Sequence, residues 1–505
     1  MSTRFDEPAV QTSPDDTAPI LPEAQLYIDG VIRGATGGRT YDVTNPWTGG
    51  VAGKAADASA EDVEAAIVAA RTAFDDTDWS LDKDKRFALM TKLRALFEAN
   101  RHRLSDLARY EAGAALAAVN TAHVGMALAG WDDLMDAFPK VTWEEDRGIR
   151  QVYGSDHSRL VVHSPIGVVG AITPWNVPLY VNVGKVVAAL LAGCTVILKP
   201  APDTPGMGSI FGELAAEAGF PAGVLNVITS ADPVTAGETL VTDPRVDLIT
   251  FTGSTGVGKR IMEKGAATLK RVFLELGGKS AKIVFDDVPN FAQDVASTML
   301  VYHAGQGCAV QSRLLVQKSR YDEAVAALKA GYAAYVDNWG SIDNPAHLMG
   351  PVVSKKQLDR IMSYIDIGQK EGATLLAGGQ ARPDRGDGFF VEPTCFVDVT
   401  NDMRIAQEEI FGPVLVVIPF EDEEDAIRIA NDSDYGLGGG VSSGDKERAM
   451  RVARRIRTGT MSVNGGMSIQ GDIPFGGVKG SGMGREWGLE GIEEFLDSKV
   501  IATRL

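Results

Sequence analysis

Several features that would place a chain in a special class of protein are scarce in this sequence. Only three of the 505 residues are cysteines, Cys194, Cys308 and Cys395, an odd and sparse set that favours a reducing cytoplasm over secretion. Basic residues are also few, with 49 Lys and Arg against 67 Asp and Glu and a net charge of −18. We therefore expect no nucleic-acid partner, because such binding depends on a positively charged surface.

Long apolar runs and metal-ligand patterns are missing as well. The longest apolar stretch, 181–198, contains Lys185 and two glycines, which argues against a membrane span. The N-terminal 22 residues lack the apolar core of a signal peptide and predict a flexible acidic tail. The six histidines follow none of the spacings typical of metal ligands, so we expect neither a metal site nor a membrane partner.

A regular alternation of short β-branched runs and helical segments begins near residue 159. At about 100 to 200 residues per domain, the length predicts two to four domains. Apolar runs such as 195–199 and 248–252 are separated by helical stretches, a pattern typical of a doubly wound parallel sheet. A second alternating region follows Gly277-Gly278, where we place a domain boundary. Sheets of this kind bind ligands at the carboxyl ends of their strands.

Shorter signals predict individual elements outside that alternation. A turn of Asp and Gly between two apolar runs predicts a hairpin over 25–33, and Ser59 caps the helix that follows. Apolar spacing predicts a continuous amphipathic helix over 85–113. Residues 150–162 are expected to form two short strands, and 499–505 an added strand at the C-terminus.

A glycine-rich turn, GSTGVG, runs from Gly253 to Gly258 directly after the strand LITFT. Backbone N–H groups and a helix dipole in such a turn can bind a pyrophosphate. The turn matches neither GxGxxG nor GxxxxGK[ST]. The residues alone therefore leave a tight structural turn equally open.

Three residues have the chemistry of a nucleophile, a base and an oxyanion donor. Cys308 lies in GQGCA, after an expected helix, and its small neighbours leave a sulfur accessible for attack; Cys194 and Cys395 are expected in the core. Glu275 ends the apolar strand VFLEL, where burial would raise its pKa toward that of a base; an exposed strand end is the alternative. Asn176, in TPWNVP, is either an oxyanion donor or an ordinary turn residue.

Taken together, these segments resemble the aldehyde dehydrogenase superfamily over nearly the whole chain, from about Tyr27 to Val500. Eight segments match in family order: TPWNVP, LKPAPDTP, FTGSTGVGK, LELGGK, GQGC, EEIFGP, NDSDYGL and PFGGVKGSGMGRE. The resemblance implies an α/β fold with a Rossmann-type cofactor domain, an α/β catalytic domain and a small β oligomerisation element. The implied boundaries are a tail over 1–22, a cofactor-binding domain over 23–142 and 164–277, a catalytic domain over 278–480, and an oligomerisation element over 143–163 and 490–505.

The resemblance also implies a role for each matching residue. Cys308 corresponds to the nucleophile, Glu275 to the general base, and Asn176, with the backbone N–H of Cys308, to the oxyanion hole. The positions implied for cofactor binding are Trp175, Lys199, Gly253, Ser254, Glu409 and Phe411. The implied reaction is oxidation of an aldehyde to a carboxylic acid with NAD(P)+, through a thiohemiacetal and a thioester on the cysteine.

Two departures from the family pattern bear on specificity. Pro202 stands where a glutamate often binds the adenosine ribose, so NAD is expected and NADP is also possible. Small or apolar residues around the site predict a roomy apolar pocket for a bulky aliphatic or aromatic aldehyde, with Tyr180 filling part of the space. The positions expected to line this pocket are Val177, Tyr180, Gly184, Gly307, Ala309 and Ile469.

Two alternative functions remain open at this point. A CoA-acylating aldehyde dehydrogenase would pass the acyl group to CoA, although such enzymes usually lack the glutamate at position 275. A non-catalytic binding protein on the same scaffold is the other alternative, and the presence of Cys308, Glu275 and Asn176 argues against it. The expected partners are a small-molecule aldehyde and further copies of the chain, as a homodimer or homotetramer.

Overall fold

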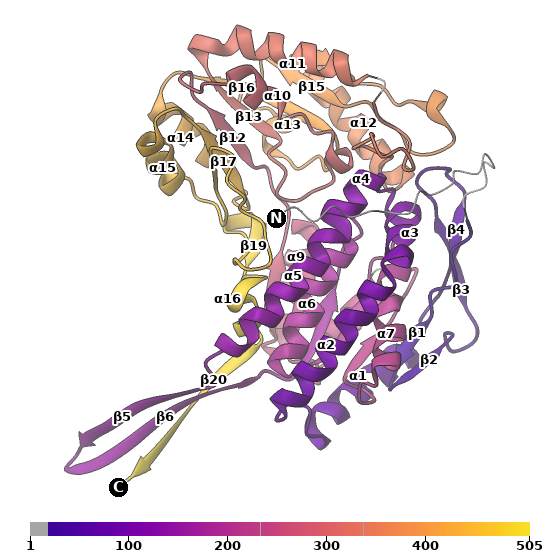
Figure 1. Ribbon diagram of the computed structural model, residues 1–505, viewed down its shortest axis with the longest axis vertical. Helices are drawn as coiled ribbons and strands as arrows, with labels where there is room; N and C mark the ends of the chain where they lie inside the picture. Colours follow the sequence, from indigo (N-terminus) through magenta and orange to yellow (C-terminus); the bar gives the residue numbers. More distant parts are fainter. Residues whose placement is uncertain (1–18, 233, 337) are drawn as a thin grey trace, which may run out of the picture.

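The computed structural model describes residues 19–232, 234–336 and 338–505, which form two lobes and a projecting β ribbon (Figure 1). The tail expected over 1–22 falls largely outside these residues. Within the described ranges, no helix combines the length and the apolar character needed to cross a bilayer.

The first lobe contains an eight-stranded sheet whose central strands are parallel. In order across the sheet, the strands are β19 (Gly482–Met483), β11 (Arg271–Glu275), β10 (Leu248–Thr252), β7 (Val168–Ile172), β8 (Thr195–Lys199), β9 (Leu225–Val227), β1 (Leu26–Ile28) and β2 (Val31–Arg33). The chain runs outward from β7 to β9 and then returns to the other side of β7 with β10 and β11. The switch point between β7 and β10 is where such sheets bind ligands, outside the carboxyl ends of the strands.

Helices pack around this sheet and bury most of its strands. They are α1 (Ala60–Asp76), α2 (Lys83–Ala99), α3 (Arg101–Ala112), α4 (Leu116–Ala118), the π-helical turn η1 (Val119–His123), α5 (Gly125–Ala137), η2 (Phe138–Lys140), α6 (Pro178–Ala192), α7 (Gly206–Ala218), α8 (Thr235–Thr242), α9 (Thr255–Gly265) and η3 (Ala266–Thr268). α6 begins with Pro178, ends at Gly193 in the left-handed conformation, and is buried along its whole length. A separate two-stranded ribbon, β3 (Thr40–Thr44) and β4 (Val51–Ala56), lies beside this lobe.

The second lobe contains a seven-stranded, mainly parallel sheet. Its strands in order are β14 (Thr374–Ala377), β15 (Thr394–Val397), β16 (Val414–Phe420), β13 (Arg313–Gln317), β12 (Ala281–Val284), β17 (Gly439–Ser442) and β18 (Ser462–Val463). Its helices and turns are α10 (Phe291–Ala296), η4 (Tyr302–Gly305), η5 (Lys318–Arg320), α11 (Tyr321–Tyr335), α12 (Lys355–Lys370), η6 (Pro383–Arg385), α13 (Arg404–Gln407), α14 (Glu423–Asn431) and α15 (Lys446–Arg455). The last elements, η7 (Lys479–Ser481) and α16 (Gly488–Glu493), return to the first lobe.

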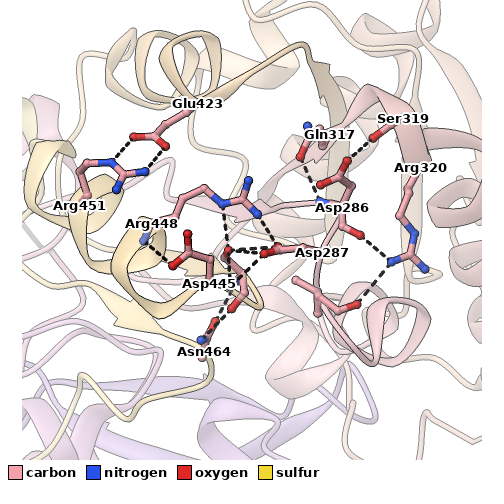
Figure 2. A network of polar contacts seen from close by, with 12 residues as sticks. Asp286, Asp287, Gln317, Ser319, Arg320, Glu423, Asp445, Arg448, Arg451 and Asn464 are labelled. Atoms are coloured by element: carbon pink, nitrogen blue, oxygen red, sulfur yellow. Dashed lines mark hydrogen bonds and ion pairs between the residues drawn. The ribbon is translucent and has the colours of Figure 1, made fainter.

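Polar contacts close the carboxyl ends of this second sheet (Figure 2). Asp287, after β12, accepts hydrogen bonds from the Ser443 hydroxyl and the Asp445 N–H, and pairs with Arg448. Cys308 lies at the opposite pole, five residues before β13 begins. The second lobe therefore presents its predicted nucleophile at the amino ends of its strands.

The third sheet forms the projecting ribbon of Figure 1. It consists of β5 (Glu144–Val152), β6 (Ser155–Pro165) and β20 (Leu496–Arg504), with β6 in the centre and all pairs antiparallel. Two predicted elements are thereby confirmed, the strand pair around the 154–155 turn and the C-terminal strand, although all three strands are longer than expected. β20 and β5 are the edges of this sheet.

The hairpin over 25–33 and the helix cap at Ser59 are also confirmed, since β1 pairs with β2 and Ser59 forms a capping box with Asp62. The continuous helix predicted over 85–113 is wrong. Asn100 interrupts it, with ψ 18°, and its side-chain amide donates to the Leu96 carbonyl. Two helices, α2 and α3, result, because the asparagine amide competes with the backbone for a helix carbonyl.

Candidate active site

Cys308 lies in an open loop between η4 and β13 instead of directly after a helix, so the expected helix is reduced to a single 3-10 turn. Its side chain is half-buried, whereas Cys194 and Cys395 are fully buried, and all three thiols are free. The loop packs closely on the Gly277-Gly278 turn, because a Cβ added to Gly278 would approach the Cys308 carbonyl oxygen to 2.3 Å. A residue larger than glycine at position 278 would therefore displace the nucleophile.

The surroundings of Cys308 favour the protonated thiol. Burial raises its pKa most, and the carboxylates of Glu275, Glu409 and Glu486 raise it further, while the Ala309 N–H acts in the opposite direction. Attack on a carbonyl needs the thiolate. A base within the same site must therefore take the thiol proton during reaction.

Glu275 ends β11 with a buried carboxyl group. Neither carboxyl oxygen has a side-chain hydrogen-bond partner in the described ranges, and the Gly477 N–H is the only backbone donor that acts on the carboxyl group. Its pKa is raised well above the ordinary value, first by burial and then by Glu486, whereas Lys185 lowers it. A Cβ added to Gly476 would lie 2.9 Å from Oε1 of Glu275, so the carboxyl packs against this glycine. Of the two alternatives left by the sequence, Glu275 is therefore the buried carboxyl group, and it lies close enough to Cys308 to raise the pKa of the thiol.

Asn176 follows β7 and is 4% exposed. Its side-chain amide donates to the Gln306 carbonyl at 3.0 Å, and Gln306 precedes Cys308 by two residues. The amide carries a second N–H, so one remains to donate near the cysteine. The structure therefore brings the predicted donor, nucleophile and base to one place from three different elements.

A buried ion pair adjoins this group and was not predicted. Lys185 in α6 pairs with Glu486, and its ammonium also donates to the Thr250 hydroxyl at 2.8 Å. The signal for Lys185 was present, because a lone lysine in an apolar helix requires a partner. The partner itself, 301 positions further along the chain, could not be read from the sequence.

The positions expected to bind the cofactor lie along the carboxyl ends of the first sheet and across to the second lobe. Lys199 ends β8 and is 2% exposed, and its ammonium makes no hydrogen bond or ion pair with any described residue; burial lowers its pKa to about 8. Gly253 follows β10, Ser254 caps α9, and Gly256 in its first turn faces open space. A free ammonium and an open helix N-terminus suit a dinucleotide, which carries ribose hydroxyls and a pyrophosphate.

The second lobe contributes a carboxylate and an aromatic ring to the positions expected to bind the cofactor. Glu409 accepts the Gly278 N–H at 2.9 Å, and a Cβ on Gly277 would approach its Oε2 to 2.5 Å. Phe411 meets Trp175 edge-on, with ring centroids 5.4 Å apart. Glu409 therefore lies on the glycine turn that joins the two lobes, next to the cysteine loop.

On the substrate side, the structure corrects the expectation for Gly184. A Cβ there would lie 3.0 Å from the Trp487 ring, and one on Gly130 would lie 2.6 Å from it. Trp487 is fully buried and stacks on Tyr180, with centroids 4.3 Å apart. The space left by Gly184 thus holds an indole ring and does not widen a substrate pocket. The remaining expected positions, Val177, Gly307, Ala309 and Ile469, are half-buried.

Among the described residues, no group of three or more His, Cys, Asp or Glu is arranged to hold a metal ion.

Comparisons with known proteins are consistent across sequence and structure. The sequence model described as "Aldehyde dehydrogenase family" matches residues 32–501. Aldehyde dehydrogenase 1 of Tanacetum cinerariifolium is 39% identical over 484 residues, 95% of each chain.

Two solved structures show the same fold. The aldehyde dehydrogenase of Mycobacterium tuberculosis complexed with NAD+ is 41% identical, with a TM-score of 0.89 over 95% of this chain and 98% of that chain. The betaine aldehyde dehydrogenase of Staphylococcus aureus in complex with NAD+ is 36% identical, with a TM-score of 0.90 over 95% and 94%.

Proposed function

Since the chain belongs to the aldehyde dehydrogenase family, and is thus an oxidoreductase, we propose that it oxidises an apolar aldehyde to the carboxylic acid with NAD+ and water. The observation that carries this proposal is the buried, unpaired carboxyl of Glu275 beside the Cys308 thiol. Hydrolysis of an acyl-enzyme needs a base of this kind to activate water. The first lobe, 23–142 and 164–277, is proposed to bind the cofactor, and 278–480 to supply the nucleophile.

In the proposed reaction, Cys308 attacks the aldehyde carbon as a thiolate. The Asn176 amide and the Cys308 N–H donate to the oxyanion of the thiohemiacetal, and one such donor typically lowers the barrier by about 3 kcal/mol. When bound, the nicotinamide supplies the hydride acceptor. Glu275 then accepts a proton from water as that water attacks the thioester, which releases the carboxylic acid and regenerates the thiol.

Lys199, Gly253 and Ser254 would hold the adenosine and pyrophosphate portions of the cofactor. Trp175, Glu409 and Phe411 would hold the nicotinamide riboside. These roles rest on the free ammonium of Lys199, the open N-terminus of α9 and the position of Glu409 beside the cysteine loop.

The variant Glu275→Gln tests the hydrolytic step. The amide has the same shape but cannot accept the proton, so we expect a burst of NADH close to one per active site, followed by steady turnover at least about 100-fold slower than wild type. Rapid mixing with absorbance at 340 nm measures both phases. Glu408→Gln, at a glutamate of the second lobe that pairs with Arg404, is the matched control and should behave as wild type. If free CoA accelerated the wild-type steady rate, the acylating alternative would replace this proposal.

The cofactor proposal is NAD+ with NADP+ as a weaker substrate. Two related structures contain NAD+, and the first lobe has no carboxylate at position 202 to repel a 2′-phosphate. The ratio of kcat/KM for the two cofactors decides the order. A ratio in favour of NADP+ would overturn it.

The substrate proposal is an uncharged aliphatic or aromatic aldehyde. Val177, Ala309 and Ile469 pack with Cys308 against one apolar cluster, and Tyr180 lies in that cluster. Because Trp487 fills the space beside Gly184, the pocket we propose is apolar and narrower than the sequence alone predicted. A panel of acetaldehyde, octanal and benzaldehyde tests this, since acetaldehyde should give the lowest kcat/KM.

A specific observation favours cationic aldehydes as a second candidate. The pKa of Asp133 in α5 is raised by burial and then by Asp472, so two carboxyl groups adjoin one another near the Ile469 loop. The pKa of the Tyr180 phenol is raised by burial first and then by Glu486, Cys308 and Asp133, so Asp133 lies within electrostatic reach of the same site. One structural relative is a betaine aldehyde dehydrogenase. Asp133→Asn would lower kcat/KM for a trimethylammonium aldehyde and leave benzaldehyde unchanged if the cationic class is the substrate.

The assembly and location complete the proposal. β20 and β5 present unpaired strand edges on the projecting ribbon, where a second copy of the chain can add strands. We propose a homodimer or homotetramer formed through this ribbon, the element over 143–163 and 490–505.

A cytoplasmic location fits the three free thiols.

A further inference from the structure

Two buried histidines lie directly behind the cysteine loop. His303 precedes Cys308 by five residues, and its ring meets His123 edge-on, with ring centroids 4.5 Å apart. Both side chains are buried, the ring nitrogens of His123 have no hydrogen-bond partner among the described residues, and the His303 ring has only the backbone of Asn176 beside it as a polar group. We call His123 and His303 the histidine pair. Such unpaired buried rings are costly for a fold, so their place beside the nucleophile calls for a reason.

The backbone at this place is strained as well. His303 has φ 46° and Ala304 has φ 51°, left-handed values that residues with a side chain rarely adopt. His123 is the last residue of the π-helical turn η1, a type of turn found often at functional sites. Tyr302 ties the two segments together, because its hydroxyl accepts the Ala122 N–H at 3.2 Å and bonds to the Thr121 hydroxyl. Strain of this kind persists only where packing holds it.

A chain of hydrogen bonds leads from His303 to the reacting groups. The His303 carbonyl accepts the backbone N–H of Gln306 at 3.1 Å and its side-chain amide at 3.2 Å. The Gln306 carbonyl in turn accepts the Asn176 amide at 3.0 Å. A change in the backbone at His303 would therefore move Gln306, and with it both Asn176 and the loop that carries Cys308.

We propose that the histidine pair is a positioning element that, through Gln306, holds the Asn176 amide and the Cys308 thiol in the arrangement needed for aldehyde addition. The proposal rests on the proposed function. Neither ring touches the reacting atoms. The His123 ring packs against the His303 ring and keeps the left-handed turn from relaxing, and the turn sets Gln306. The pair joins segments of both lobes, since η1 lies between α4 and α5, which Figure 1 shows with the first lobe, and η4 is followed by β13 of the second.

Two readouts test the proposal in the full-length protein. One is the single-turnover rate of NADH formation, and the other is the rate of Cys308 alkylation by iodoacetamide, located by mass spectrometry. We expect His123→Ala to slow both about tenfold, since a displacement of the order of 1 Å costs at least that much in a positioned site. The affinity for NAD+ should be unchanged. His123→Phe, which keeps a ring of similar shape, should restore most of both rates, and His102→Ala in α3 is the matched control.

A double variant separates positioning from a general loss of structure. Asparagine adopts left-handed backbone readily, so His303→Asn should hold the turn without help from residue 123. We expect His303→Asn to keep both rates near wild type and His123→Ala to have no further effect in that background. Equal slowing by His123→Ala in both backgrounds would overturn the proposal.

A further variant tests the proposal in case the His123→Ala protein does not fold. If His123→Ala does not fold, Tyr302→Phe removes the hydroxyl that ties the same turn to η1, and an unchanged alkylation rate in that variant would overturn the proposal. Alkylation needs neither aldehyde nor cofactor. A wild-type protein without aldehyde-dependent NADH formation would therefore refute the proposed function and leave this test standing.

Discussion

Cys308 shares its surroundings with three carboxyl groups, and the charge state of one of them governs the proposed reaction. The pKa of Glu275 is raised well above its ordinary value by burial and by Glu486, and Lys185 only partly offsets this. Glu275 must be ionised to accept a proton from water. The hydrolytic rate should therefore rise with pH as Glu275 loses its proton.

A substitution can shift, in a known direction, the pH at which the hydrolytic rate rises. Glu486→Gln removes a negative neighbour and leaves the Lys185 ammonium without its partner, and both changes lower the pKa of Glu275. We expect the rising limb of kcat to move to lower pH. The kcat profile between pH 5 and pH 9 measures the shift, with Glu493→Gln on the exposed side of α16 as control. If the rising limb of the kcat profile did not move, the ionisation of Glu275 would not control kcat.

The histidine pair predicts a pH dependence of stability. Burial lowers the pKa of His303 to about 4 and that of His123 well below its ordinary value. The unfolded chain binds protons below its histidine pKa near 6.5, whereas the folded chain does not, so stability is present above 6.5 and falls as pH approaches 4. At pH 5 the loss from His303 is about 2 kcal/mol. Urea unfolding at pH 7.5 and pH 5 should show a smaller loss for His303→Asn than for wild type.

Single residues also mark the limit of what the sequence predicts at the site. Cys308, Glu275 and Asn176 were singled out by residue type and sequence context, which left an exposed strand end open for Glu275 and an ordinary turn open for Asn176, and the family resemblance implied their roles. Glu486 was not, because its role depends on Lys185, a contact made only by folding. Gly184 was misjudged for the same reason, since the residue that fills its space is Trp487, far along the chain.

At the scale of elements, α5, α6 and the segment before α16 enclose one indole ring. The Trp487 ring lies against Gly130 and Gly184, where an added Cβ would be 2.6 and 3.0 Å away. Each of Gly130→Ala and Gly184→Ala should lower the free energy of unfolding by about 1–3 kcal/mol, the usual cost of overpacking. Gly130→Ala should have the larger effect because its Cβ would lie closer to the ring. Thermal unfolding measures this. In a Trp487→Leu background the cost of Gly184→Ala should largely disappear, and a cost that persists would mean that the helix backbone and not the ring is responsible.

The carboxyl ends of the second sheet provide a second test at this scale. In Figure 2, Asp287 joins the loops after β12 and β17 through the Ser443 hydroxyl and the Asp445 N–H. Desolvation tends to raise the pKa of Asp287, but the N–H groups of Gly444 and Asp445, with Ser443 and Arg448, hold it below its ordinary value. Asp287→Ala should lower the unfolding temperature by several degrees, since it leaves these four donors without the Asp287 carboxylate as acceptor. Glu423→Gln, which breaks the exposed pair with Arg451, should change it little.

Elements were predicted best where their signals are local. The strands β8 and β10 have the bounds that the sequence predicted, because in each a β-branched run extends without interruption. The helix over 85–113 failed at Asn100, where one side-chain hydrogen bond decides the outcome. The π-helical turn at 119–123 has no sequence signature and could not be foreseen.

At the scale of the whole molecule, the projecting ribbon leaves apolar side chains exposed. Val500 is 68% exposed and Ile501 is 44% exposed on β20, while Ile149 on β5 is 65% exposed. If copies of the chain associate there, replacing Val500 and Ile501 with lysine should shift the protein toward monomers in light scattering. Leu269→Lys, at a residue 93% exposed on the body, is the control. An unchanged mass would place the interface elsewhere.

The arrangement of the two lobes could be predicted only in part. Alternating strands and helices predicted two parallel sheets, and the doubly wound pattern placed the glycine turn at the carboxyl ends of the first. The same rule does not hold for the second lobe, where the cysteine loop lies at the amino ends of the strands. A local sequence pattern predicts the strand order and direction in a sheet. It does not predict whether the amino or the carboxyl ends of the strands face the other lobe.

The three thiols, taken together, bear on how long the protein survives in air. Burial raises the pKa of Cys194 to about 12 and raises those of Cys308 and Cys395 as well. Peroxide oxidises thiolates and reacts poorly with protonated thiols. We therefore expect the fully buried Cys194 and Cys395 to stay reduced in air, and any loss of activity without a reducing agent to follow the oxidation of the half-buried Cys308 alone.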